Sequence, residues 1–327
     1  MKSKPALVMA SFVLGSALVV AQTGGQAPAP AAPLPPETTA PDVPGVVKGG
    51  TRVQLVKAGF NGTEGPIAMP DGSLVFTELN LNRLTKIDKD GQTSTYVEDT
   101  KRTTGLGYDP KGRLIGSSQE GFILLLAPTR AVLADKFEGQ PLSRPNDVAV
   151  DKKGGVYFSN QVVPMDTEPP SRARKPAIFY LKPDGQLVIA SETVERPNGV
   201  TLTKDGKTLF ATNREFLVAF DVQLDGSLRN QRNFAELVGL SKAPDGTPMG
   251  GADGIIMDDA DRLYASTGPG VQIFSRQGKH LGTIPIPLPP QNIAFAGADR
   301  KTLYAVGRGA VYKIAMLAQG NKERGGR

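Results

Sequence analysis

The sequence contains no cysteine and only one histidine, His280. Without cysteine the chain can form no disulfide, no thiolate nucleophile and no cysteine-based zinc site. His280 lies in the segment 277–281, which we interpret as a hairpin turn. A Ser-His-Asp triad would depend on this one turn residue, and a histidine-rich metal site is impossible.

The net charge is small and glycine is plentiful. The 327 residues carry a formal net charge of +6, which is spread along the chain without a basic run between aromatic residues. This pattern indicates a solvated surface and no nucleic-acid partner. The 38 glycines and 27 prolines follow no three-residue period, so they favour many turns between short strands over collagen. The length suits two average domains or one large all-β domain.

The N-terminus has the pattern of a secretory signal. Lys2 and Lys4 precede an apolar run at residues 6–20, and Val19-Val20-Ala21 has the small residues of a cleavage site. An uncleaved membrane anchor is the alternative, but the run is short for a spanning helix. No cysteine follows, which excludes a lipoprotein anchor. An exported protein without disulfides points to a bacterial periplasm or exterior, with no stable membrane insertion after cleavage.

Composition divides the chain into four predicted segments. Residues 1–21 form the signal peptide, and residues 22–45 form a disordered spacer rich in proline and alanine. Residues 46–318 form the folded domain, and residues 319–327 form a flexible basic tail.

One loop-and-hairpin pattern organises the folded part. Arg144-Pro145-Asn146-Asp147 precedes an alternating strand, a Lys-Lys-Gly-Gly turn and a second strand that ends at Asn160. Glycine in the turn supplies the positive φ that a tight hairpin requires. The same Arg-Pro-Asn loop returns at 196–198, again before a hairpin.

Related patterns occur six times. They are anchored at Gly65, Gly105, Asn146, Asn198, Asp253 and Asn292, which by subtraction are 40, 41, 52, 55 and 39 residues apart. Strand-containing repeats of this period predict an all-β fold, a six-bladed β-propeller with four-stranded antiparallel blades around a central metal channel. The segment 52–56 precedes the first repeat and is expected to complete the last blade. The longer steps leave loops at 162–175 and 238–251, whose size suggests functional lids.

Four oxygen-bearing side chains occupy equivalent repeat positions. In a propeller, the loops that lead into the innermost strands open onto one end of the channel. We therefore expect Glu64, Asn146, Asn198 and Asp253 to converge there. Two carboxylates and two carboxamides suit a hard dication, with Ca²⁺ favoured and Zn²⁺, Mn²⁺ and Mg²⁺ left open, and leave coordination positions for water or substrate. The alternative is that each residue merely shapes its own loop.

From about residue 53 to residue 314 the chain resembles the senescence marker protein/gluconolactonase/luciferin-regenerating-enzyme-like family of six-bladed propellers. The motifs that carry the resemblance are Glu64-Gly65-Pro66, Arg144-Pro145-Asn146-Asp147, Arg196-Pro197-Asn198-Gly199 and Ala252-Asp253-Gly254. The resemblance implies one divalent cation in the channel and hydrolysis of lactones.

The expected chemistry is that the cation polarises the lactone carbonyl while Asp253 activates a water molecule, or, as the second choice, attacks as nucleophile. Arg144, Asn146 and Thr104 are the predicted substrate contacts, and Asp147 is interpreted as structural. The partner is a small-molecule lactone. The oligomeric state is left open.

Three other interpretations remain. The same ligand set suits a phosphotriesterase-like hydrolase, which lactone and phosphotriester assays at fixed calcium would separate. A non-enzymatic periplasmic binding or scaffold propeller predicts no ester hydrolysis at all. A propeller resembling strictosidine synthase is disfavoured, because it would leave the oxygen ligand set without a purpose.

Overall fold

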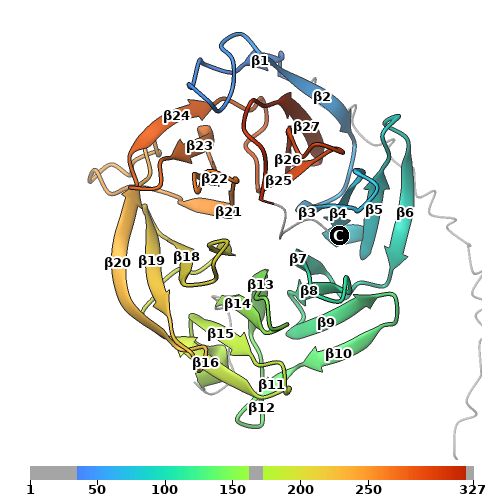
Figure 1. Ribbon diagram of the computed structural model, residues 1–327, viewed down its shortest axis with the longest axis vertical. Coiled ribbons are helices and arrows are strands. Elements are labelled where there is room, and N and C mark those ends of the chain that lie inside the picture. The colour runs from blue at the N-terminus through green and yellow to red at the C-terminus, as the bar shows by residue number, and fades with distance from the viewer. Residues whose placement is uncertain (1–34, 162–171, 322–327) are drawn as a thin grey trace, which may run out of the picture. The chain divides into compact units, whose positions relative to one another are not determined.

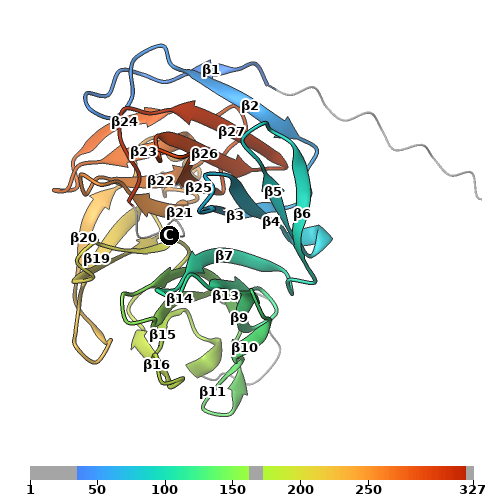
Figure 2. The same cartoon turned by 45° about the vertical axis from the view of Figure 1, so that its right-hand side comes forward.

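The computed structural model describes residues 35–161 and 172–321. These residues form six antiparallel sheets that succeed one another around a central axis, as the ring of blades in Figure 1 shows. The turned view in Figure 2 shows the same ring of blades obliquely. The predicted all-β six-bladed propeller is therefore confirmed.

Each of the first five blades is a four-stranded meander in chain order. Blades 1 and 2 comprise β3 (Thr63–Ala68), β4 (Leu74–Glu78), β5 (Arg83–Ile87), β6 (Thr93–Glu98), β7 (Thr103–Tyr108), β8 (Leu114–Ser118), β9 (Phe122–Ala127) and β10 (Ala131–Ala134). Blades 3 and 4 comprise β13 (Arg144–Val150), β14 (Val156–Gln161), β15 (Ala177–Leu181), β16 (Leu187–Ser191), β17 (Val200–Leu202), β18 (Thr208–Asn213), β19 (Phe216–Val222) and β20 (Leu228–Glu236). Blade 5 comprises β21 (Ala252–Met257), β22 (Leu263–Thr267), β23 (Gly270–Phe274) and β24 (His280–Ile284).

Small elements lie outside these blades. The strands β11 (Lys136–Phe137) and β12 (Gln140–Pro141) form a separate hairpin, and two short 3-10 helices cover η1 (Leu79–Leu81) and η2 (Arg172–Arg174). Within the described residues, no helix is long and apolar enough to span a membrane.

Strands from both ends of the chain close the ring. Blade 6 contains β25 (Asn292–Ala296), β26 (Thr302–Gly307) and β27 (Ala310–Ala315), and β2 (Arg52–Ala58) pairs antiparallel with β27. The prediction that the segment 52–56 completes the last blade is therefore confirmed. The two-residue strand β1 (Thr38–Thr39) adds a fifth strand outside β2.

Apolar contacts between neighbouring blades form the core. Ile67 and Val75 of blade 1, for example, pack with Leu106 and Leu114 of blade 2. The inner strands are buried on both faces, as in β4 and β8, whereas the outermost strand β6 is largely exposed. Only a neighbouring blade can cover each inner strand, and this explains why the repeats close into a ring.

Two segment boundaries differ from the sequence prediction. The predicted spacer 22–45 falls partly outside the described residues, but its last part is folded: Ala40 and Val43 are buried in the core between the fifth and sixth blades. The first residues of the predicted tail are also ordered, because the amide of Gly320 donates to the carbonyl of Arg300 at 2.9 Å. The signal peptide, residues 162–171 of the first long loop and residues 322–327 of the tail lie outside the described residues.

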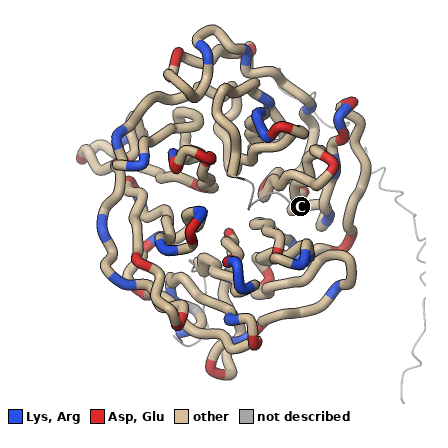
Figure 3. The backbone as a smooth tube through the Cα atoms, in the orientation of Figure 1, with Lys and Arg blue, Asp and Glu red and all other residues tan. Residues whose placement is uncertain are grey.

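The meander gives the ring two distinct faces. Because adjacent strands run in opposite directions, the loops leading into the innermost strands open onto the same face as the turns between second and third strands. We call this the site face. The turns after the first and third strands lie on the opposite face. Lys and Arg residues alternate with Asp and Glu around the circumference (Figure 3), in agreement with the small net charge.

Candidate functional site

A backbone irregularity recurs where the predicted site residues stand. The pairing of the first two strands shifts register after Glu64 in blade 1, after Pro145 in blade 3 and after Ala252 in blade 5. A register shift of this kind turns a side chain out of the regular pleat. The motifs at Glu64, Asn146 and Asp253 therefore share a local geometry as well as a repeat position.

Glycines that follow the site residues let adjacent blades approach closely. A Cβ atom on Gly65 would lie 1.7 Å from the carbonyl oxygen of Thr104, and one on Gly199 would lie 2.3 Å from that of Asp253. The amide of Gly199 donates to the same Asp253 oxygen at 3.0 Å. The Glu-Gly and Asn-Gly pairs are therefore required for blade contact near the axis, and not only for turns.

Three of the four predicted ligands act on one another. The Asn198 side chain donates a hydrogen bond to the Asp253 carboxylate, and the charges of Asp253 and Glu64 act on each other. Asn198 is further fixed because its backbone amide donates to Thr212 Oγ1 at 3.0 Å. The structure thus brings together side chains from blades 1, 4 and 5.

The other predicted residues lie on the second and third blades. Asn146 is buried near the start of β13, and its carbonyl accepts a hydrogen bond from Thr104 Oγ1 at 2.5 Å. The hydroxyl proton of Thr104 is therefore engaged in positioning Asn146, and a substrate contact by Thr104 remains a prediction. The Nε atom of Arg144 is buried without a hydrogen-bond partner.

Sequence reasoning missed the residues that hold Glu64. Gln291 Nε2 donates to Glu64 Oε1 at 3.1 Å, and the side chain of Asn292 also donates to this carboxylate. Both belong to blade 6. The signal was available, because Asn292 occupies the same repeat position as the four predicted ligands.

Asp147 has the structural role that was expected, together with an electrostatic one. Its Oδ2 accepts the backbone amide of Val200 at 3.1 Å, which links blades 3 and 4. Its buried negative charge also acts on Asp253 and Glu64. Three carboxylates thus lie near one another at this end of the channel.

This crowding changes the acidity of the site. Burial, followed by the charge of Asp147, raises the pKa of Asp253 from 3.8 to about 7. Burial, followed by the charge of Asp253, raises the pKa of Glu64 well above its usual value. The positive charges of Arg308 and Arg144 oppose the shift at Asp253. Ionising both carboxylates together is therefore unfavourable unless a positive charge joins them.

The donor set fits a hard cation. Asn198 Oδ1 is buried and has no hydrogen-bond partner, so an acceptor oxygen is left unsatisfied next to Asp253. No cluster of three or more His, Asp and Glu side chains with metal-site geometry occurs in the described residues. The candidate set differs from such clusters because carboxamide oxygens supplement two carboxylates. Oxygen donors of this kind suit Ca²⁺.

A cavity of about 600 Å³ opens beside these residues on the site face. Asn198, Asp253, Arg196, Arg308 and Gly251 are among the residues that line it. Gly251 belongs to the second predicted long loop, 238–251, so that loop does contribute to the cavity wall. The volume lies within the range of small-molecule pockets.

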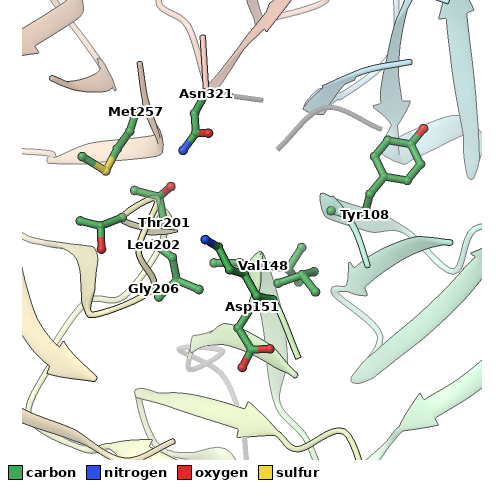
Figure 4. Close-up of a pocket in the computed structure, with 13 residues that line it drawn as sticks. Tyr108, Val148, Asp151, Thr201, Leu202, Gly206, Met257 and Asn321 are labelled. Atoms are coloured by element: carbon green, nitrogen blue, oxygen red, sulfur yellow. The ribbon is translucent and has the colours of Figure 1, made fainter. Parts of the chain in front are cut away.

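The other end of the channel is different. A small cavity of about 60 Å³ lies there, lined among others by Tyr108, Val148 and Thr201 (Figure 4). Asn321 lines the same cavity, and its backbone amide donates to the backbone carbonyl of Met257 at 3.3 Å. No predicted site residue lines this second cavity.

Comparison with known proteins gives a family match and several relatives. Residues 62–307 match the family model described as "SMP-30/Gluconolactonase/LRE-like region". A gluconolactonase of Zymomonas mobilis subsp. mobilis is 24% identical over 265 residues, which cover 72% of this chain and 72% of that protein. Pentonolactonase XacC of Haloferax volcanii is 24% identical over 257 residues, covering 75% and 81% of the two chains.

Solved structures show the same fold. Regucalcin from Agrobacterium tumefaciens, described as a calcium-binding protein, has a TM-score of 0.69 and 16% identity, and the match covers 85% of this chain and 98% of that chain.

Proposed function

Because the chain belongs to the SMP-30/gluconolactonase/LRE-like family, we propose that it is a lactonase-type hydrolase that depends on a divalent cation, with Ca²⁺ favoured. The relatives named gluconolactonase and pentonolactonase support a lactone substrate. The observation that carries the cation requirement is the buried, unpartnered Oδ1 of Asn198 beside the Asp253 carboxylate.

Four side chains would hold the cation. Glu64, Asn198 and Asp253 interact in the structure, and Asn146 comes from the equivalent position of blade 3. Gln291 fixes the orientation of Glu64 through its hydrogen bond. When bound, the cation supplies Lewis-acid polarisation of the lactone carbonyl and stabilises the negative oxygen that forms.

Asp253 is the proposed general base. Its carboxylate lines the cavity, where a water molecule between it and the substrate would lose a proton to it. The hydrogen bond from Asn198 orients this carboxylate, and the nearby charges of Arg308 and Arg144 favour its ionised form. The resulting hydroxide attacks the carbonyl carbon, the ring C–O bond breaks, and the proton on Asp253 passes to the leaving alkoxide.

The test combines metal analysis with a substrate panel. Purified protein is analysed for bound metal before and after exhaustive treatment with a chelator, and D-glucono-1,5-lactone and a pentonolactone are assayed in both states. We expect hydrolysis to disappear with the metal and to return with Ca²⁺. Asp253→Asn should lower kcat by about 100-fold to 10,000-fold. The control is Asp90→Asn, an exposed turn aspartate.

Two results would overturn the proposal. One is undiminished lactone hydrolysis by metal-free protein. The other is a calcium-loaded protein that hydrolyses neither lactone, even if it hydrolyses a phosphotriester added to the panel.

A further inference from the structure

We infer that the substrate carries an anionic group, a carboxylate or a phosphate, outside the lactone ring, and that Arg308 and Arg196 bind this group. The inference rests on the proposed function, which assigns the cavity on the site face to a lactone. It adds a substrate class that the neutral sugar lactones named for the relatives do not include.

Three arginines from separate loops line the same cavity. Arg196 belongs to the loop that leads into β17, Arg214 to the turn between β18 and β19, and Arg308 to the turn between β26 and β27. The first two loops belong to blade 4 and the third to blade 6. The meander brings all three to the site face, although they span more than a hundred positions of the chain.

Only one of these three arginines has an acidic partner. Arg214 Nε donates to Glu195 Oε2 at 2.6 Å, which compensates its charge. Among the described residues, the guanidinium groups of Arg196 and Arg308 form no salt bridge. Neither guanidinium group is therefore held in an ion pair with a described residue, although the charge of Arg308 acts on Asp253.

A fourth arginine adds another positive charge near Asp253. Arg144 forms no salt bridge with a described residue, and its buried Nε has no hydrogen-bond partner. Gln161, which pairs with Arg144 in the β13–β14 ladder, lines the cavity. The charge of Arg144 acts on Asp253. A buried N–H donor without an acceptor, as at this Nε, is costly to keep unless a ligand supplies one.

The turn that carries Arg308 is tied to the proposed reaction centre. The backbone amide of Arg308 donates to Gln291 Oε1 at 3.1 Å, and Gln291 Nε2 donates to Glu64 at 3.1 Å. Gln291 thus connects the turn that carries Arg308 to Glu64, a proposed ligand of the cation. This connection fixes the position of a charge on the substrate relative to its reacting carbonyl.

The charge distribution within the cavity selects one orientation. Asp253 marks the position at which the ester would react, and its carboxylate repels a second anion. Arg308 and Arg196 provide donors that match the planar oxygens of a carboxylate or the face of a phosphate. A substrate with an anionic tail would therefore bind with the tail at the arginines and the ring at Asp253. A neutral polyol cannot use this match.

The experiment compares three lactones at fixed calcium: D-glucono-1,5-lactone, a glucaric acid lactone and 6-phosphogluconolactone. We expect the wild type to have the higher kcat/KM on one or both anionic lactones. Arg308→Gln should lower kcat/KM on the neutral lactone through the lost charge beside Asp253, and should lower it about tenfold to hundredfold further on the preferred anionic lactone. Arg308→Lys should recover part of the loss. Comparing the glucaric acid lactone with 6-phosphogluconolactone shows whether the site prefers a carboxylate or a phosphate.

Arg276→Gln is the matched control. It removes the same charge from the turn between β23 and β24, on the opposite face, and should leave the preference unchanged. Equal kcat/KM values for neutral and anionic lactones, or an Arg308→Gln variant that retains the preference, would overturn the inference while leaving the lactonase proposal intact.

A binding measurement separates the inference from catalysis. D-glucuronate, glucose 6-phosphate and neutral D-glucose are titrated calorimetrically into wild type and Arg308→Gln. If no lactone is hydrolysed, the proposed function fails, and these titrations decide the anion site independently. The anion site is supported if the wild type binds an anionic sugar more tightly than D-glucose and Arg308→Gln abolishes this difference. Equal binding of all three sugars, or no binding, contradicts it.

Discussion

Asn198 donates a hydrogen bond from its side-chain amide to the carboxylate of Asp253, while the oxygen of the same amide is buried without a partner. The two residues lie in different blades, and the loop of one is fastened to the strand of the other by the hydrogen bond from Gly199 to the Asp253 carbonyl. The amide is thus satisfied on its donor side and open on its acceptor side. An acceptor held open in this way suits a cation and has little value for stability alone.

The first prediction concerns that open oxygen. Asn198→Ala removes a proposed ligand and also the donor that orients Asp253. Calcium affinity should therefore fall by about tenfold to hundredfold. Calorimetric titration of calcium into chelator-treated protein measures the change. Asn80→Ala, at an exposed position on the 3-10 helix η1, is the control and should bind calcium as the wild type does. Unchanged affinity in Asn198→Ala would remove this residue from the ligand set.

The second prediction is an unusual pH dependence of stability in the cation-free protein. The pKa of Asp253 is raised from 3.8 to about 7 in the folded protein. At any pH between these two values, the folded protein holds a proton on Asp253 that the unfolded chain has released. Folding is therefore favoured at low pH, and this contribution is lost as pH rises through about 7. The shift at Glu64 has the same sign.

We expect the Tm of chelator-treated protein to fall between pH 5 and pH 8, and saturating calcium to reduce the fall. Asp253→Asn should flatten the slope in chelator, whereas Asp90→Asn should preserve it. Thermal unfolding followed by circular dichroism measures this, since the chain has no tryptophan. A Tm that rises over the same interval would contradict the prediction.

Much of the ring could be predicted because each repeat carries its own turn and strand pattern. The turn after Val150 illustrates this: its glycine was expected to have positive φ, and Gly154 has φ 88°. The pairs Glu64-Gly65 and Asp253-Gly254 identified the site face for the same reason, since propeller geometry places equivalent positions together.

What could not be predicted depends on long-range pairing. The hydrogen bond between Gln291 and Glu64 joins residues 227 positions apart, and no local sequence pattern predicts it. Arg300 and Arg308 both lie in turns that flank β26, and only the fold places one of them, Arg308, at the cavity. Composition also misjudged residues 35–45, because Ala40 and Val43 pack against an apolar surface that the fifth and sixth blades form together.

The third prediction tests ring closure. Val53 is fully buried in the core between the fifth and sixth blades and belongs to β2, the strand that joins the N-terminal segment to β27. Val53→Ala should lower the free energy of unfolding by about 2 kcal/mol, from lost apolar burial and the cavity that remains. Urea unfolding followed by circular dichroism measures this. Gln54→Ala changes the exposed neighbour in the same ladder and should have little effect. Equal losses in both variants would argue against a closing role for the buried face of β2.

The fourth prediction separates blade contact from loop shape at the candidate site. A Cβ on Gly199 would lie 2.3 Å from the Asp253 carbonyl oxygen and 2.9 Å from the amide nitrogen of Ile255. Both obstacles are backbone atoms, so Gly199→Ala must push the Asn198 loop away from β21. We expect calcium affinity to fall with this displacement, together with a loss of stability. Gly268→Ala provides the control, because a Cβ there meets no atom within 4 Å. If Gly199→Ala unfolds more readily but binds calcium normally, the separation between Asn198 and Asp253 does not determine cation binding, and the proposed ligand set would have to exclude one of them.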